Sequence, residues 1–477
     1  MMWNFISEKM QRCESSFFDG GNRRYSYKDI ISLVSEHGFV LRDKLPAKSK
    51  CAILCDEGLN STIAILSCWF ANLIPIPLSK NYGEKHCEDV IEHTKPDVLI
   101  TDCNEDCSYD FVYNIHLKIF NGQKLCTPFK ENLHDVALIM CTSGSTGRAK
   151  GVMITAQGLK MNIFAIADYF NINSDDTIMI ARPLYHCAVL TGEFLISLYN
   201  GVNIVFFDQK YTPTGIISAA NHFDVTVLCA TPTLFNHISL FMNRHNQSST
   251  VTKIALSGEC LTKTVADQIR KAFPKACIYN VYGLTEASPR VSYLPPKCFD
   301  KYSESVGLPL KGTEIKIIDT ENGVEQPINL PGCILVKSPS LMKGYYNNQE
   351  LTNLVITDGW LNTGDIGFKD ENEFIYILSR ADDMIIKGGM NIYPKEIENA
   401  LNSLNEVKET MVYGIRSESG QDIAIDVILE DDFVDMGIKP LLRLFAAVLP
   451  EFQMPTEVHL VKEFARNASG KLIRPNK

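Results

Sequence analysis

The 477-residue chain lacks the patterns of several common protein classes. It has 46 lysine and arginine residues against 56 aspartate and glutamate residues, a formal net charge of −10. Without a basic excess, nucleic acid and anionic membrane surfaces are disfavoured as partners, since both favour a positively charged protein surface. The 15 cysteines contain no C-x-x-C pair. Zinc sites and disulfides are therefore disfavoured, and reduced thiols of a cytoplasmic protein are expected.

Targeting and membrane-spanning patterns are also missing. The first 18 residues do not show the charged and then apolar regions of a signal peptide. The most apolar stretch, residues 61–78, contains Asn72, Pro75 and Pro77, and a helix could not continue through these prolines across a bilayer. We interpret this stretch as a buried helix that leads into a strand, and we expect no transmembrane segment.

What the chain does have is an alternation of helical and strand-like patterns. Apolar residues at helical spacing predict a helix over residues 27–45, and short β-branched runs predict buried strands at 51–55 and 97–101. Further strands are expected at DTIMIA, NIVFF, VTVLCA, KIALSG and CIYNVYG. This order predicts an α/β fold with mostly parallel sheets between helices, whose ligands bind outside the carboxyl ends of the strands.

The pattern changes near Val306. Short strands separated by glycine, proline and asparagine predict an antiparallel β subdomain. After residues 379–383, a compact final piece contains a predicted helix with Pro394 in its first turn and an apolar stripe that includes Ile397 and Leu401. This piece is long enough to form a small domain of its own.

Residues 141–151, CTSGSTGRAKG, form a candidate phosphate-binding loop with four hydroxyls, three glycines and Lys150. Glycine permits a close approach of the backbone, whose N–H groups can line a concavity for anions. The loop is not a Walker sequence, because Ala149 stands where a motif that starts at Gly144 needs glycine. We expect a strand over 138–144 before the loop, which places the loop at the carboxyl end of a strand, and a helix over 159–170 after it.

Eight motifs follow one another in a defined order. They are TSGSTGRAKG (142–151), PLYH (183–186), LSGECL (256–261), YGLTEAS (282–288), GCILVKSPSLMKGYYN (332–347), DGWLNTGDIG (358–367), SRADDMIIKGGMNIYPKEIE (379–398) and ASGK (468–471). In this order the chain resembles, over nearly its whole length, the superfamily of acyl-CoA synthetases, peptide-synthetase adenylation domains and firefly-type luciferases.

The resemblance implies both a fold and a two-step reaction. The fold has a large domain (1–382) of two mostly parallel α/β sandwich subdomains and a β-barrel-like subdomain. A small mobile α+β domain (383–477) follows, with a hinge at Asp382. In the first step, a carboxylate attacks the α-phosphate of ATP with the help of Mg²⁺ and yields acyl-adenylate and pyrophosphate. In the second, a phosphopantetheine thiol takes the acyl group and releases AMP.

The resemblance also implies how ATP is held. Tyr282 would stack on adenine, Thr285 would contact the α-phosphate, and Glu286 would hold Mg²⁺, which usually takes one or two carboxylates together with substrate phosphates. Asp365 would accept both ribose hydroxyls, and Arg380 would contact ribose or phosphate. The ATP-binding residues implied in this way are Thr142, Ser143, Gly144, Ser145, Thr146, Gly147, Lys150, Gly258, Glu259, Tyr282, Gly283, Asp365 and Arg380.

Catalysis is implied to use residues of both domains. Lys471 in ASGK matches a lysine that bridges the carboxylate and the α-phosphate, where an ammonium offsets the repulsion of two anions. Rotation of the small domain at Asp382 would remove Lys471 from the active site after the first step. It would bring in a second loop, whose residues line the path of the thiol. The catalytic residues implied are Lys471, Glu286, Thr285 and His186, and those of the thiol path are Lys387, Gly388 and Gly389.

The acid pocket is predicted around His186, where many acyl-CoA ligases have a histidine. Residues 186–194 offer no aspartate to pair with a substrate ammonium, so free amino acids are disfavoured. The predicted pocket residues are His186, Cys187, Val189, Ala230, Ser257, Val281 and Gly283. They are mostly apolar and fit an alkyl or aryl carboxylic acid. Enlarging Gly283 is expected to shift the preference toward shorter acids.

The acceptor of the acyl group stays open at this stage. KGGMNIYPKEIE resembles stand-alone CoA ligases, and no phosphopantetheine-type serine motif follows ASGK in the 477 residues. Coenzyme A and a separate acyl or peptidyl carrier protein are therefore both candidates. A non-catalytic relative would have lost Lys471, Glu286 or Asp365, all of which are present. Luciferase-type oxidation shares these motifs and also stays open.

Overall fold

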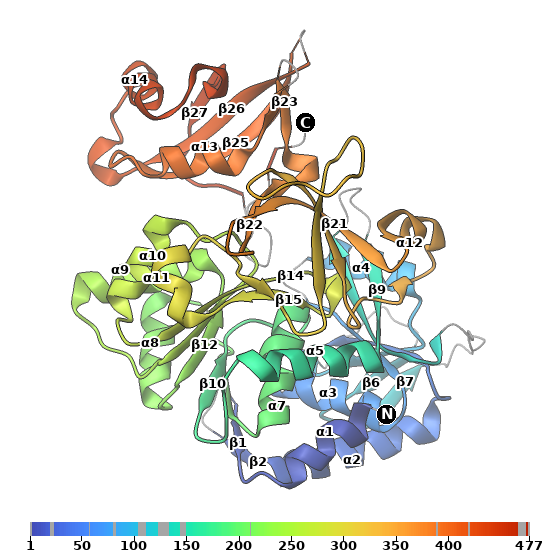
Figure 1. Cartoon of the computed structure of the whole chain (residues 1–477). Coiled ribbons are helices and arrows are strands. Elements are labelled where there is room, and N and C mark those ends of the chain that lie inside the picture. Colours follow the sequence, from blue (N-terminus) through green and yellow to red (C-terminus); the bar gives the residue numbers. More distant parts are fainter. Residues whose placement is uncertain are drawn as a thin grey trace.

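The protein is described by a computed structural model. It covers residues 2–19, 23–56, 58–79, 83–103, 111–122, 133–143, 149–209, 211–387, 390–417, 420–465 and 474–475. Figure 1 shows the N-terminal part (blue) at the bottom and the C-terminal part (orange to red) at the top. Within the described ranges, no helix has both the length and the apolar character needed to cross a membrane.

The largest sheet has nine strands. Six of them, from β14 to β1, are parallel, and antiparallel pairs flank them at both edges. In spatial order the strands are β16 (Leu308–Pro309), β15 (Arg290–Leu294), β14 (Cys277–Gly283), β13 (Lys253–Leu256), β12 (Val227–Ala230), β10 (Thr177–Ile180), β11 (Asn203–Phe206), β1 (Ser16–Phe18) and β2 (Arg24–Ser26). The five strands expected from DTIMIA to CIYNVYG are β10 to β14, so this part of the prediction is confirmed.

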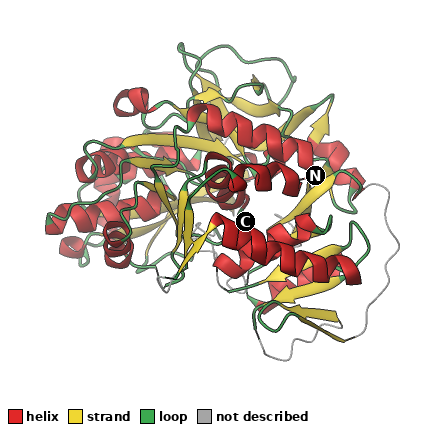
Figure 2. Cartoon of the chain, turned by 90° about the horizontal axis from the view of Figure 1, so that it is seen from below, coloured by secondary structure: helices red, strands yellow, loops and turns green. Residues whose placement is uncertain are grey.

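Apolar side chains bury both faces of this sheet. One face packs on helices that contribute the buried Ile216, Phe235 and Ile269, and the other face belongs to a larger core that includes Ile6 and Tyr27. Figure 2 shows the helices that cover the strands. The helices of the first face are α8 (Pro213–His222), α9 (Pro232–His245), α10 (Lys263–Ala272) and α11 (Phe299–Tyr302), and those of the larger core are α1 (Met2–Gln11), α2 (Tyr27–Lys44), α3 (Gly58–Phe70), α5 (Ala156–Tyr169) and α7 (Ile196–Asn200).

A second sheet of five strands packs in the same large core. Its first four strands are parallel, and its last pair is antiparallel. Residues 61–78 form most of α3 and strand β4, as the prolines in this stretch predicted. In spatial order the strands are β4 (Ile74–Pro77), β3 (Lys50–Leu54), β5 (Val98–Thr101), β6 (Phe111–Asn114) and β7 (Ile119–Gly122), and α4 (Glu84–Thr94) precedes β5.

The start of α2 shows how local sequence sets an element. The Oγ of Ser26 accepts a hydrogen bond from the backbone N–H of Asp29 (3.1 Å), and a carboxylate oxygen of Asp29 accepts one from the N–H of Ser26 (2.7 Å). Two backbone donors at the helix start are thereby satisfied by side chains. The helix predicted over residues 27–45 is confirmed as α2.

A third sheet corrects the prediction for the phosphate-binding loop. The loop joins β8 (Val136–Ser143) to β9 (Ala149–Thr155), and these two strands are antiparallel, with β19 (Gly344–Tyr345) beside β9. The sequence analysis expected a strand and then a helix, and it missed β9. The loop is therefore the tip of an antiparallel hairpin and does not lie at the carboxyl end of a strand in one of the two mostly parallel sheets.

The antiparallel β subdomain is confirmed. It contains β17 (Glu314–Ile318), β18 (Gly332–Lys337), β21 (Trp360–Lys369), β20 (Ile356–Thr357) and β22 (Ile375–Arg380), with α12 (Gln349–Val355) before β20. Each strand pairs antiparallel with its neighbour. The buried Ile315, Ile334, Val336 and Ile375 form its core together with Val291 of the large sheet.

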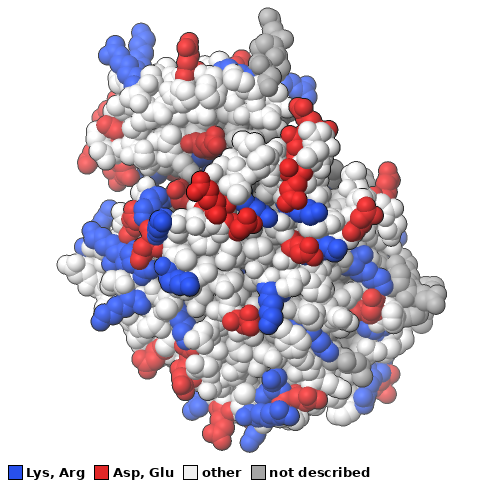
Figure 3. Space-filling view, viewed as in Figure 1, with Lys and Arg blue, Asp and Glu red and all other residues white. Residues whose placement is uncertain are grey.

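The final part of the chain has its own core, to which Ile397, Val412, Ile425 and Phe445 contribute. In Figure 1 it lies above β21 and β22. Figure 3 shows that positive and negative side chains are interspersed over this face of the protein. The elements of this part are η6 (Ala381–Asp383), β23 (Ile385–Lys387), β24 (Met390–Ile392), α13 (Pro394–Leu401), β25 (Val407–Ser417), β26 (Gly420–Leu429), η7 (Asp431–Phe433), α14 (Ile438–Val448), η8 (Glu451–Gln453) and β27 (Glu457–Leu460).

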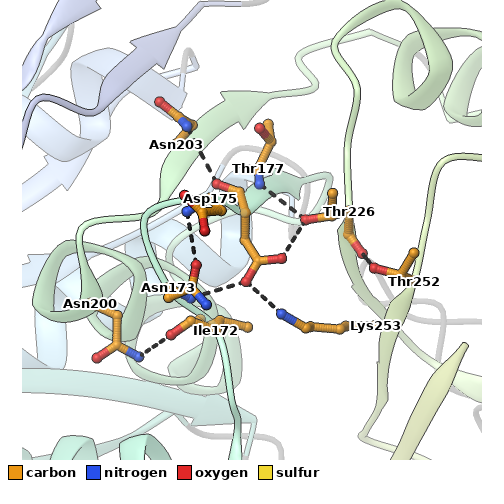
Figure 4. Close-up of polar contacts among 10 residues, drawn as sticks. Ile172, Asn173, Asp175, Thr177, Asn200, Asn203, Thr226, Thr252 and Lys253 are labelled. Carbon is orange, nitrogen blue, oxygen red and sulfur yellow. Dashed lines mark hydrogen bonds and ion pairs between the residues drawn. The ribbon is translucent and has the colours of Figure 1, made fainter.

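A polar network ties together the amino ends of three parallel strands (Figure 4). The carboxylate of Asp176 accepts hydrogen bonds from Lys253 Nζ (2.6 Å), Thr226 Oγ1 (2.8 Å) and the N–H of Asn173 (3.0 Å). These residues precede or begin β10, β12 and β13. The polar side chains at the amino ends of these three strands thus pair with one another. Ligands are expected at the opposite, carboxyl edge of the sheet.

Candidate active site

Parallel pairing brings several predicted site residues to the carboxyl edge of the large sheet. Ala230 pairs with Leu256, and Leu256 pairs with Asn280, so the residues that follow these strand ends are neighbours. Ser257 is buried beside Ala230, and its N–H donates to the Ala230 carbonyl (3.1 Å). The motifs LSGE and YGLTE therefore lie side by side at this edge.

The residues predicted to bind ATP at the end of β14 and in the β subdomain contact one another directly. The hydroxyl of Tyr282 donates to Oδ2 of Asp365, and Nη1 of Arg380 donates to Oδ1 of Asp365 (3.0 Å) and to the carbonyl of Thr363 (2.9 Å). Asp365 and Arg380 are also opposite each other on β21 and β22. Burial, followed by the negative charge of Asp365, raises the pKa of Tyr282, so its hydroxyl remains a donor.

Glu286 lies in a short turn of helix, η4 (Thr285–Ala287), directly after β14. Its Oε1 accepts a hydrogen bond from the hydroxyl of Tyr345 (2.8 Å), and its carbonyl accepts one from the N–H of Met342 (2.7 Å). Burial and the charge of Glu286 raise the pKa of Tyr345. A carboxylate oriented in this way fits the predicted role of holding Mg²⁺, an ion that prefers oxygen ligands.

Tyr345 also connects Glu286 to the hairpin of β8 and β9, which carries the candidate phosphate-binding loop. β19 pairs with β9, and the ammonium of Lys150 lies 5.7 Å from the centre of the Tyr345 ring. Thr142 is opposite Lys150 in the hairpin, and Ser143 ends β8. The other predicted residues of this loop, Gly144, Ser145, Thr146 and Gly147, lie outside the described residues.

Glu259 has a local partner in the structure. Its Oε2 accepts hydrogen bonds from the N–H (3.1 Å) and the hydroxyl (2.7 Å) of Thr233, in the first turn of α9. A carboxylate at this position stabilises the start of a helix. Gly258 before it has a φ of 96°, a conformation that favours glycine. The predicted contact of these two residues with ATP stays a prediction.

The predicted acid-pocket residues are mostly buried, among them Cys187, Val189 and Val281, and His186 is partly buried. His186 precedes the short helix α6 (Cys187–Val189), after which the chain forms a π-helix, η3 (Leu190–Leu195). Burial, with a smaller contribution from the positive charge of Arg182, lowers the pKa of His186 to about 3. The imidazole is therefore neutral at physiological pH, which suits a pocket that takes an apolar group.

Gly283 needs a correction. A Cβ at this position would lie 2.2 Å from the carbonyl oxygen of Pro289, because β14 and β15 approach closely at a bulge. A larger residue would have to displace the backbone rather than fill space in a pocket. The expectation that enlarging Gly283 selects shorter acids was therefore wrong as a pocket test, since the substitution would distort the strand pair.

The predicted thiol path and hinge are partly described. Lys387 ends β23, and its ammonium contacts Asp422 Oδ1 (3.3 Å) and donates to the Met454 carbonyl (3.3 Å). Asp382 lies in η6, directly after β22. Gly388, Gly389 and Lys471 lie outside the described residues. The predicted roles of these three residues therefore stay predictions.

Sequence reasoning missed four residues beside the site. Tyr345 holds Glu286, and the charged residues Arg182, Glu193 and Arg290 lie next to the predicted acid pocket. A signal existed for one of them, since Glu193 interrupts the otherwise apolar run 187–196, where a charge is expected to be buried with a partner. The other three depend on contacts between distant segments.

Together, the fold and this arrangement define an adenylate-forming enzyme. The chain belongs to the family of AMP-binding enzymes: the family model described as AMP-binding enzyme matches residues 7–346, and that of the AMP-binding enzyme C-terminal domain matches residues 396–471. The superfamily, the fold and the ligase class predicted from the sequence are thereby confirmed. The roles of individual residues stay predictions.

Relatives with established names are similar over most of the chain. A 2-succinylbenzoate–CoA ligase of Bacillus pumilus is 33% identical over 465 residues, which are 95% of this chain and 92% of that protein. A long-chain-fatty-acid–CoA ligase of Escherichia coli is 32% identical over 348 residues, which are 71% of this chain and 61% of that protein.

Solved structures support the fold. That of the o-succinylbenzoate CoA synthetase of Bacillus subtilis, in complex with its acyl-adenylate intermediate, has a TM-score of 0.84 and 24% identity, and the match covers 98% of this chain and 96% of that one. An amide bond synthetase of Marinactinospora thermotolerans has a TM-score of 0.87 and 20% identity, with 99% and 98% covered.

Replacing Tyr345 by phenylalanine is expected to raise the Mg²⁺ concentration for half-maximal pyrophosphate release about tenfold. A hydrogen bond to a charged group is worth about 1.5–3 kcal/mol, and 1.4 kcal/mol corresponds to tenfold. The measurement is a Mg²⁺ titration at saturating ATP and acid. Tyr346→Phe is the matched control, because the hydroxyl of that buried neighbour contacts Lys50 Nζ (3.2 Å). Equal Mg²⁺ requirements for both variants would contradict a positioning role for Tyr345.

Proposed function

We propose that the protein is an AMP-forming acid–thiol ligase. It converts ATP and a carboxylic acid to acyl-adenylate and pyrophosphate, and then transfers the acyl group to the thiol of coenzyme A with release of AMP. The observation that carries this proposal is the meeting of Tyr282, Asp365 and Arg380, with Glu286 four residues after Tyr282 in the same motif. These groups come from two subdomains and form one polar binding site for a nucleotide and its metal ion.

In the proposal, four residues act on ATP and its metal ion. The Asp365 carboxylate, positioned by Tyr282 and Arg380, accepts hydrogen bonds from the ribose hydroxyls. Glu286 would hold Mg²⁺, which when bound neutralises phosphate charge. Thr285 faces the α-phosphate. Lys471 supplies the ammonium that the attacking carboxylate and the α-phosphate share in the transition state.

Coenzyme A is the acceptor that the relatives favour. Proteins named as CoA ligases are 33% and 32% identical to this chain over most of its length. In the proposal, Lys387, Gly388 and Gly389 line the path of the pantetheine arm. A carrier protein with the same phosphopantetheine group is the alternative acceptor, and the experiment below separates the two.

The acid is an alkyl or aryl carboxylic acid. By their names, the relatives act on 2-succinylbenzoate or on long-chain fatty acids, which share a carboxylate on a largely apolar body. The buried Cys187, Val189, Ala230 and Val281 suit such a body. His186, neutral because burial lowers its pKa to about 3, adds no charge to the pocket.

The proposal also includes a division into two domains and a location in a reducing compartment. Residues 383–477 move as a small domain about Asp382, and the separate apolar core around Ile397 and Phe445 supports this division. None of the 13 cysteines in the described part of the chain is in a disulfide, which suits the cytoplasm.

A panel of carboxylic acids tests the proposed function. The protein is incubated with ATP, Mg²⁺ and each acid, and pyrophosphate release is followed with and without coenzyme A. We expect acyl-adenylate from some acids, and acyl-CoA with AMP when coenzyme A is present. If folded protein releases pyrophosphate with none of the acids, the proposal is wrong. Acyl-adenylate that coenzyme A does not discharge, but a phosphopantetheinylated carrier protein does, would identify the alternative acceptor.

A further inference from the structure

Three charged side chains are buried together beside the predicted acid pocket. Arg182 follows β10, Glu193 lies in the π-helix η3, and Arg290 begins β15. Glu193 is fully buried, Arg290 is 2% exposed, and the Arg182 side chain is 14% exposed. Nη2 of Arg182 lies 2.5 Å from Oε1 of Glu193. We call these three residues the buried charge cluster.

The buried charge cluster lies beside several residues of the predicted acid pocket. Nη2 of Arg182 donates to the hydroxyl of the buried Ser257 (3.4 Å). Arg182 acts electrostatically on His186, and Arg290 acts on Cys187 and Glu193. His186, Cys187 and Ser257 all belong to the predicted acid pocket, so charge is present where the sequence predicted mainly apolar contacts.

The cluster carries an excess of positive charge. Within the cluster, two guanidinium groups face one carboxylate, and burial lowers the pKa of His186 to about 3 and raises that of Cys187 to about 12. A further carboxylate that acts on Cys187 is that of Glu286, which the proposed function assigns to Mg²⁺. Burial also raises the pKa of Glu193 itself, so any protonation would increase the excess. A buried charge without a counter-charge is costly, and buried charges are therefore normally paired.

Three polar atoms of the cluster lack partners. Nε of Arg182, Nε of Arg290 and Oε2 of Glu193 are buried and have no hydrogen-bond partner among the described residues. Buried polar groups are nearly always hydrogen-bonded, so such atoms together mark a place where a ligand completes the pairing. The excess of donors and of positive charge selects an anion.

The backbone accommodates Arg290 at this position. A Cβ on Gly192 would lie 2.8 Å from Nη2 of Arg290, so the absence of a side chain in the π-helix makes room for the guanidinium. Asn162 Nδ2 donates to the Arg290 carbonyl (2.9 Å), and its Oδ1 accepts from the Arg290 N–H (3.2 Å). The Arg290 backbone is thus held by Asn162 of α5, and its guanidinium packs against the π-helix at Gly192, as expected for a residue with a defined binding role.

We propose that Arg182 and Arg290 bind a second carboxylate of the acid, so that the substrate is a dicarboxylic acid. This inference rests on the proposed function. The reacting carboxylate is adenylated, and the second one pairs with the guanidinium groups, whose planar donor pattern matches a carboxylate. Glu193 orients Arg182 and limits the excess charge when the pocket is empty.

Matched acids test this inference. The first pair is 2-succinylbenzoate and 4-oxo-4-phenylbutanoate, which is the same acid without the ring carboxylate. The second pair is adipate and hexanoate. We expect kcat/KM for pyrophosphate release to be about 100-fold or more higher for the diacid of at least one pair, because a monoacid leaves the excess positive charge of the cluster without a counter-charge. Equal or higher values for both monoacids would overturn the inference and leave the proposed function standing.

Variants of the buried charge cluster are expected to change the ratio of kcat/KM for a diacid to that for its matched monoacid, in opposite directions. Arg290→Met and Arg182→Met are expected to lower the diacid-to-monoacid ratio at least tenfold, whereas Glu193→Gln, which keeps the shape and removes a negative charge, is expected to raise it. A purely structural cluster would change stability but not this ratio, and a constant ratio would overturn the inference. Because Glu193→Gln is nearly isosteric, it remains informative if an arginine variant fails to fold.

Calorimetry separates failure of the inference from failure of the proposed function. If no acid is adenylated, the proposed function fails, and the binding of each matched acid to the folded protein with ATP is measured directly. Tighter binding of the diacids, weakened by Arg290→Met, would still support the second carboxylate site. Indistinguishable binding of diacids and monoacids would overturn it.

Discussion

Replacing Lys471 by alanine is expected to lower the rate of pyrophosphate release about 100-fold or more, since removal of one preorganised charge from a transition state commonly has this effect. Lys471 lies outside the described residues, and the prediction rests on its place in ASGK. The acid carboxylate and the α-phosphate are both anionic, and the ammonium offsets their repulsion. Thioester formation from a supplied acyl-adenylate should change only a few-fold, because no such repulsion arises in that step.

The two half-reactions are measured separately for Lys471→Ala and for Gly389→Trp. The tryptophan should block the pantetheine path and spare adenylation, which is the opposite pattern. Lys462→Ala, a change at an exposed lysine nearby in the sequence, is the matched control and should affect neither step. If Lys471→Ala and Gly389→Trp lower both steps equally, the prediction of two alternating poses is wrong and a single static site remains.

Replacing Asp365 by alanine is expected to raise the dissociation constant of ATP about 100-fold. Asp365 is 7% exposed, and its carboxylate is positioned by Tyr282 and Arg380. Two hydrogen bonds from ribose to this carboxylate, each worth about 1.5–3 kcal/mol, account for such an effect. Alanine also leaves the Arg380 guanidinium without its ion-pair partner next to the nucleotide. Calorimetric titration with ATP measures the change.

A double-mutant cycle with 2′-deoxy-ATP shows whether Asp365 acts on ribose. The wild-type protein should bind 2′-deoxy-ATP at least tenfold more weakly than ATP, and Asp365→Ala should bind the two nucleotides almost equally. Asp365→Asn, which keeps the shape, separates the loss of charge from the loss of packing. Equal discrimination by the wild-type protein and Asp365→Ala would mean that this carboxylate does not contact the 2′-hydroxyl.

Elements with strong local periodicity were predicted well from the sequence. The helical spacing in residues 27–45 and the β-branched runs at β10 to β14 reflect burial on one or both faces, and local sequence records this burial directly. β9 was missed because its first residues, Ala149 to Gly151, continue the glycine-rich loop and carry no strand pattern. Its pairing with β8 is local, but its pairing with β19 joins segments that are nearly 200 residues apart.

The candidate site was predicted at the level of motifs but not of contacts. The motif order identified Tyr282, Glu286, Asp365 and Arg380, three of which meet in the structure. The hydrogen bond between Tyr345 and Glu286 joins residues 59 positions apart, and no local pattern reports it. For the same reason, the close approach of β14 to the Pro289 carbonyl, which excludes a side chain at Gly283, could not be foreseen.

The π-helix η3 (Leu190–Leu195) makes this segment sensitive to insertions and deletions. A π turn holds one residue more than an α turn, so loss of a single residue would restore regular α geometry. Because the π turn absorbs the extra residue, the flanking helical parts would keep their orientation, and the change would be concentrated in the turn that contains Glu193. Glu193 would then leave Arg182, and the acid pocket would change its charge pattern without any substitution.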